Sequence, residues 1–153
     1  MTNEEKQYIS GLFKSENYKE LYKTHSSVIN QMLMIDNEDD FEFFIEEEGS
    51  LDEEVFRLHY SALHGDSLLI GGYEGDVTEK VSEFLKQRLP ESLFKNIKED
   101  IKEINADIDD NDNLEERIGT LNERLESQKY SIQIYFDDLY CAGEFFLTID
   151  EEQ

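Results

Sequence analysis

One acidic run in this chain has nearly the spacing of a calcium-binding loop. In DIDDNDNLEERI, Asp107, Asp109 and Asn111 occupy the first, third and fifth positions, where such a loop supplies oxygen ligands. The sixth position is Asp112, where a glycine is needed for the sharp turn, and the twelfth is Ile118, where a bidentate glutamate belongs. We therefore interpret the run as an acidic turn that caps a helix, and we expect no metal site.

The other residues that could do chemistry are also poorly placed for it. The three histidines, His25, His59 and His64, lack the spacing of an HExxH zinc motif, and His25 is in phase with an apolar stripe. Cys141 has no nucleophile signature around it and is interpreted as a small buried apolar residue. The glycine-rich segment 71–75 lacks both the GxGxxG order and the Gly-Lys-Ser/Thr ending of phosphate loops. The sequence predicts no enzyme and no cofactor.

Charge is the dominant feature of the sequence, and it is segregated. The 153 residues include 38 Asp and Glu against 14 Lys and Arg, a net charge of -24. Residues 1–35 and 77–106 are each balanced, with equal numbers of acids and bases. Residues 36–76 hold fourteen acids and one base, and residues 107–153 hold fourteen acids and three bases. Because like charges this close repel one another, the pattern favours a function that needs them.

The carboxylates of two runs are the predicted partner-binding residues. The first run contains no base, and its acids are Asp36, Glu38, Asp39, Asp40, Glu42, Glu46, Glu47, Glu48, Asp52, Glu53 and Glu54. The second run contributes Asp107, Asp109, Asp110, Asp112, Glu115 and Glu116. For the aromatic residues Phe43 and Tyr73 we favour a core position; if exposed, they would add hot-spot contacts.

The magnitude of the charge suggests a function. Duplex DNA carries one charge per ~1.7 Å of axis, so 24 charges correspond to roughly 41 Å of duplex. In charge and size alone, the chain resembles acidic phage-type antagonists of restriction, repair or CRISPR nucleases. We therefore expect an inhibitor that mimics phosphate charge and blocks the basic groove of a DNA- or RNA-acting enzyme. An immunity-type protein that neutralises a cognate toxin fits the same composition, as does a non-catalytic regulatory adaptor. Solvated acidic faces without a partner are the remaining interpretation.

Composition bounds the setting of this function. A single cysteine, the absence of an apolar signal segment in the first residues and the absence of a long apolar run predict a cytoplasmic protein without a membrane span. The negative charge argues against direct contact with nucleic acid or anionic lipid. The length predicts a single domain, residues 1–153, and a homo-oligomer is compatible with all of these expectations.

The elements expected to position the carboxylates alternate in type along the chain. A capping box formed by Thr2 and Glu5 predicts a helix over 3–13. Apolar spacing predicts helices over 17–34, from 76 to Pro90, over 91–106 and from 114 to 125. The last two helices form an antiparallel hairpin with its tip near 107–113. Strands are predicted over 41–46, 67–73, 130–138 and 144–150. For 51–64 the capping box SLDE, which begins at Ser50, favours a helix, whereas the alternation favours a strand. We favour the strand. The order indicates an α+β fold with a small antiparallel sheet.

Overall fold

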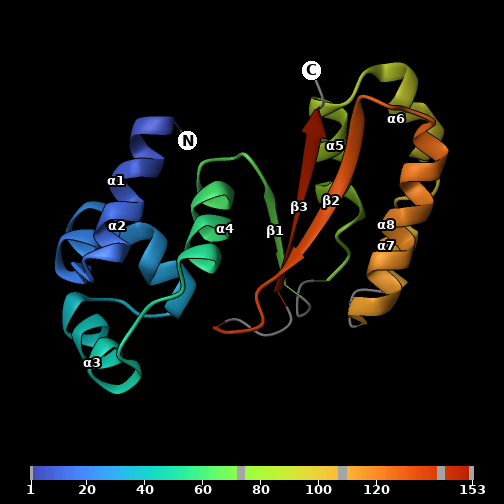
Figure 1. The fold of residues 1–153 in the computed structure, drawn as a ribbon. Helices are drawn as coiled ribbons and strands as arrows, with labels where there is room; N and C mark the ends of the chain where they lie inside the picture. Colours follow the sequence, from blue (N-terminus) through green and yellow to red (C-terminus); the bar gives the residue numbers. More distant parts are fainter. Residues whose placement is uncertain (1, 72–74, 107–109, 141–143, 152–153) are drawn as a thin grey trace. The chain divides into compact units, whose positions relative to one another are not determined.

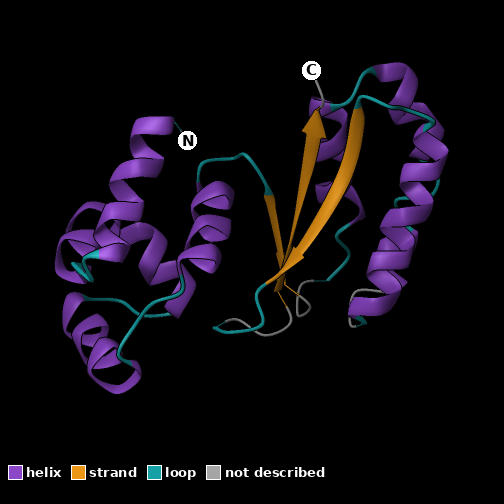
Figure 2. Cartoon of the chain, in the orientation of Figure 1, coloured by secondary structure: helices purple, strands orange, loops and turns teal. Residues whose placement is uncertain are grey.

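The computed structural model describes residues 2–71, 75–106, 110–140 and 144–151. Over these residues the protein is α+β, with eight helices and a three-stranded antiparallel sheet, which confirms the predicted fold class (Figures 1 and 2). The contacts divide the chain into two compact units. The described part of the first unit is 2–65 with 139–140, and that of the second is 66–138 with 144–151. Cooperative folding as one domain stays a prediction.

The first unit is helical, and its helices enclose a core of aliphatic and aromatic side chains. Its elements are α1 (Asn3–Lys14), α2 (Tyr18–Leu33), α3 (Glu38–Glu48) and α4 (Glu53–Leu63). The first two agree with prediction to within a residue or two. The core side chains with the least exposure include Ile9, Leu21, Ile29, Met32 and Phe56.

The prediction of a strand over 41–46 is wrong, because this segment lies within α3. The Asn37 side chain caps the helix by accepting a hydrogen bond from the Asp40 N–H at 2.9 Å. Gly49 ends the helix in the left-handed region, at φ 81°, where glycine carries no steric cost. Phe41, Phe44 and Ile45 have the i, i+3, i+4 spacing of a helical stripe. These capping and packing signals outweigh the partial alternation of aromatic residues.

The prediction favoured for 51–64 is also wrong, since these residues form α4 rather than a strand. Asp52 caps it by accepting a hydrogen bond from the Val55 N–H at 2.8 Å. Phe56 and Tyr60, one helical turn apart, are both buried in the core. The helical alternative indicated by the capping signal is therefore correct, with Asp52 rather than Ser50 as the cap.

The second unit carries the sheet and the remaining helices. Its helices are α5 (Thr78–Arg88), α6 (Glu91–Ile97), α7 (Glu103–Ala106) and α8 (Asn111–Leu125). The predicted helix over 91–106 is divided, because residues between α6 and α7 form shorter-range turns such as Asp100 N–H to the Ile97 carbonyl, 2.9 Å. Both α6 and α7 pack against α8, as the predicted hairpin requires. Residues 107–109 of its tip lie outside the described residues.

The strands β1 (Leu68–Gly71), β2 (Tyr130–Phe136) and β3 (Glu144–Glu151) form the sheet in the order β1-β3-β2. The C-terminal hairpin predicted from the alternation is confirmed by the β2–β3 pairing, in which Ile132 lies opposite Ile149. Buried side chains of the strands and of α5, α6, α7 and α8 make one continuous core. In the part of the chain that the structure describes, no helix has the length and apolar character needed to cross a bilayer.

Acidification is expected to destabilise the protein through His25. Burial lowers the pKa of the His25 imidazole below its usual 6.5, opposed by the Glu5 carboxylate and reinforced by His64. Protons then bind the unfolded chain more readily, so stability present above about pH 6.5 is lost as the pH falls toward the folded pKa. Urea unfolding at about pH 7.5 and pH 5.5 measures the loss. It should shrink in His25→Gln, and an equal loss in both proteins would contradict the assignment.

Asn122 of α8 holds the backbone of β2 through two hydrogen bonds. Its side-chain oxygen accepts from the Ile132 N–H at 2.7 Å, and its side-chain nitrogen donates to the Ile132 carbonyl at 3.0 Å. Asn122→Ala should therefore lower the free energy of unfolding by about 1–3 kcal/mol, because both backbone groups lose their partner in a half-buried place. Glu123→Ala, the exposed neighbour, is the matched control and should change stability far less. Equal losses in the two variants would show that the hydrogen bonds contribute little.

Candidate functional site

Seven of the predicted partner-binding residues lie on the single helix α3. They are Glu38, Asp39, Asp40, Glu42, Glu46, Glu47 and Glu48. All seven are exposed, and none forms an ion pair with any other described residue. Helix α3 is therefore the densest run of uncompensated charge among the described residues.

Three apolar side chains hold this charged helix against the first unit. Phe41 is 2% exposed and stacks on Tyr22 with 5.1 Å between ring centroids. Phe44 meets the Tyr140 ring edge-on at 5.7 Å, and Ile45 is half-buried beside them. Because these residues occupy one stripe of the helix, the remaining circumference is left to present carboxylates.

The acidic residues at the C-terminal end of α3 destabilise the free protein, unlike those in its first turn. Glu38, Asp39 and Asp40 lie in the first turn, where the positive end of the helix dipole favours them. Glu46, Glu47 and Glu48 lie at the other end, where a cation would be favourable and an anion is not. The series Glu38, Glu42, Glu46 also places like charges four residues apart, which destabilises a helix.

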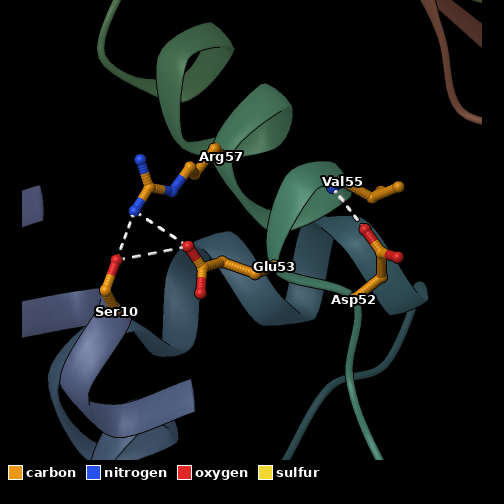
Figure 3. Close-up of polar contacts among 5 residues, drawn as sticks. All are labelled: Ser10, Asp52, Glu53, Val55 and Arg57. Atoms are coloured by element: carbon orange, nitrogen blue, oxygen red, sulfur yellow. Dashed lines mark hydrogen bonds and ion pairs between the residues drawn. The ribbon is translucent and has the colours of Figure 1, made fainter. Parts of the chain in front are cut away.

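Two residues of the first predicted run, Asp52 and Glu53, stabilise the free protein through contacts of their own (Figure 3). Asp52 is the cap of α4. Glu53 forms an ion pair with Arg57 at 2.8 Å and accepts a hydrogen bond from the Ser10 hydroxyl at 3.2 Å. The Arg57 guanidinium also donates to the Ser10 oxygen at 2.6 Å, which closes a triangle between α1 and α4. Asp36 and Glu54, by contrast, are exposed.

The second predicted cluster belongs to the other unit, at the start of α8. Asp110 caps this helix by accepting a hydrogen bond from the Asn113 N–H at 3.2 Å. Asp112, Glu115 and Glu116 are exposed on its first turns, and Asp107 and Asp109 lie outside the described residues. Carboxylates at a helix N-terminus are favoured by capping and by the dipole, so this cluster has a structural explanation that the end of α3 lacks.

A groove beside α3 adds a feature that the sequence did not indicate. It has a volume of about 330 Å³, and Tyr18, Phe41 and Ile45 form its apolar part. Along one side lie Glu38, Glu42 and Glu46, one helical turn apart. The segment Glu16–Lys19 forms the other side. The four-residue spacing of the glutamates is the signal for this arrangement, and it has that meaning only when 38–48 is recognised as a helix.

Phe43 stands out among the aromatic residues because its side chain is 64% exposed. It lies on the outward side of α3, away from Phe41 and Ile45. Its neighbours at helical spacing are all acidic, namely Asp39 and Asp40 on the preceding turn and Glu46 and Glu47 on the following turn. The core position favoured for Phe43 from the sequence is therefore wrong, and the exposed alternative is correct. Tyr73 lies outside the described residues.

The described residues contain no group of three or more His, Cys, Asp and Glu side chains arranged to hold a metal ion. The chain matches no protein-family model, and comparison with curated proteins and with solved structures returned no match. The site is therefore characterised by its own geometry: a helix with an apolar inner stripe, an acidic groove along one side and a phenylalanine surrounded by carboxylates.

Reversing one charge at the end of α3 should stabilise the free protein. Glu47→Lys places a cation at the negative end of the dipole, which should raise the free energy of unfolding by about 0.3–1 kcal/mol. Glu54→Lys, the matched control, makes the same change of net charge in the first turn of α4 and should destabilise by a similar amount. Urea unfolding of both variants at low salt tests the pair. Equal shifts of the same sign would mean that net charge, and not position, sets the effect.

Proposed function

We propose that this protein is a non-catalytic, cytoplasmic acidic inhibitor that occupies the basic groove of a DNA- or RNA-acting enzyme. The observation that carries the proposal is the set of seven exposed carboxylates on α3 without an ion-pair partner among the described residues. Three of them oppose the helix dipole, so the free protein gains nothing from their position. Lysine and arginine side chains of a partner would remove that repulsion.

The density of charge on α3 is of the order found in nucleic acid. Eleven residues of helix span about 16 Å, over which α3 carries seven carboxylates. The same length of duplex DNA carries about ten phosphates. A groove built to bind phosphates would thus meet a comparable number of anions, although on one helix rather than two strands. Release of counterions would favour the association.

One observation favours the alternative, an immunity-type protein that neutralises a single cognate toxin. Phe43 is exposed at the centre of the acidic surface, and phosphate mimicry has no use for an apolar side chain there. Aromatic anchors are typical of interfaces that recognise one partner through a few strong contacts. Binding of this kind survives salt better than binding through charge alone.

Affinity capture from bacterial lysate at about 0.1 M and about 0.5 M salt, with mass spectrometry of the bound proteins, tests the proposal. Nucleic-acid enzymes should be captured at the lower salt and largely lost at the higher. The purified protein should then inhibit the captured enzyme, and added DNA should compete with it. A single partner without nucleic-acid activity, retained at both salt concentrations, would contradict the proposal.

Charge-reversal pairs locate the interface on whichever enzyme is captured. Glu46→Lys with Glu47→Lys should weaken inhibition by about tenfold or more, because two cations then face a basic groove. Glu115→Lys with Glu116→Lys makes the same change in the second predicted cluster. Glu79→Lys with Glu83→Lys, exposed residues of α5 outside both clusters, controls for net charge. Equal weakening by all three pairs would mean that the overall field, and not α3, drives binding.

A further inference from the structure

We propose that the groove beside α3 and the adjoining Phe43 form one docking surface for a cationic amphipathic segment of the partner protein. The inference rests on the proposed function in requiring a basic partner. It goes further by assigning apolar contacts to the interface. The partner segment that binds would therefore carry arginine or lysine side chains together with exposed aliphatic side chains such as leucine.

The groove supplies both kinds of contact within a short distance. The apolar lining of the groove, made mainly by the half-buried Ile45 with the exposed edges of the largely buried Tyr18 and Phe41, can accept the aliphatic part of an arginine or lysine side chain. Glu42 and Glu46 at the edge can then accept hydrogen bonds from its charged end, and arginine binds a carboxylate through two parallel bonds. A groove of about 330 Å³ is large enough for one or two such side chains.

Phe43 extends this surface around the helix. Glu46 lies at the groove and also one turn from Phe43, so the two features share a carboxylate. A phenylalanine that is 64% exposed gains by burial in an apolar socket, and the four surrounding acids would meet cations at the rim of that socket. An apolar centre with a polar rim is the usual organisation of a protein–protein interface.

Charge complementarity decides which occupant fits. A second copy of this chain would bring another -24 charges to an acidic surface, and nucleic acid or anionic lipid would be repelled in the same way. Lys19 is the cation among the described residues that line the groove, against Glu16, Glu38, Glu42 and Glu46. The surface therefore selects for a positively charged segment that also carries apolar side chains.

Two peptides of about 18 residues, long enough to form a helix, separate apolar docking from charge attraction. One is built of arginine and leucine with the leucines on one face, and the other has glutamine in place of every leucine. Binding to the full-length protein is followed by NMR on backbone amide signals and by calorimetry. At about 0.15 M salt the arginine–leucine peptide should bind at least about tenfold more tightly and shift the amides of α3 and of Glu16–Lys19.

Matched variants test which side chains carry the binding. Phe43→Ala should lower the affinity for the arginine–leucine peptide by about tenfold or more. Leu63→Ala, which removes an exposed apolar side chain from α4, should change that affinity by less than about twofold. Glu42→Gln should weaken binding and Glu54→Gln, exposed outside the groove, should not. Lys19→Ala should strengthen it by about twofold. Circular dichroism confirms that each variant keeps its helices.

Each contrary result has a distinct meaning. Equal affinity of the two peptides with no effect of Phe43→Ala overturns the docking surface and leaves the proposed function, since charge alone would then suffice. Amide shifts confined to α8 overturn it by placing the interface elsewhere. Failure of both peptides to bind also overturns it, and enzyme capture with DNA competition decides the proposed function independently.

Discussion

Repulsion among carboxylates destabilises the first unit, and its structure must offset that repulsion. At α3 the offset comes from a narrow stripe of buried apolar side chains. Seven acids occupy an eleven-residue helix, and the contacts that hold it are those of Phe41 on Tyr22, Phe44 on Tyr140 and the half-buried Ile45. Burying three such side chains contributes several kcal/mol, roughly the scale needed to offset unfavourable dipole and like-charge terms of a few tenths each. Burial of the apolar inner side of α3 thus offsets the electrostatic repulsion on its acidic outer side.

The sequence predicted most of the fold where one signal dominated. Clear apolar periodicity located α2, α5 and α8, and a capping box located α1. Clear alternation located β2, and the glycine turn before residue 144 located β3. It failed for 41–46, where Phe41, Phe43 and Ile45 alternate as a strand would, although Phe43 proves to be 64% exposed. The alternation was accidental, because Phe43 does not contribute to the core. The decisive helix signals, an asparagine cap and a glycine stop, lie just outside the apolar run at Asn37 and Gly49.

The sequence predicted the candidate site only in part, because local signals do not report how the helices pack. Which residues are acidic follows from the sequence, and so does their concentration in two runs. Which of them are already engaged does not, because Glu53 is paired with Arg57 and Ser10 across two helices. The groove could not be predicted from the sequence either, since it forms where Tyr18 of α2 meets Phe41 and Ile45 of α3. Such a meeting depends on how helices pack, a property that local spacing does not specify.

The first unit is not a continuous stretch of chain. Tyr140, from the connection between β2 and β3, places its ring against Phe44 and accepts a hydrogen bond from the Asp52 N–H at 2.9 Å, across 88 residues of sequence. Chains emerge from the ribosome in order, N-terminus first. Helices α1 to α4 are therefore synthesised well before the tyrosine that completes their packing. The acidic helix α3 acquires this aromatic neighbour only after the chain has been made as far as residue 140, so α3 reaches its final packing well after its own residues are synthesised.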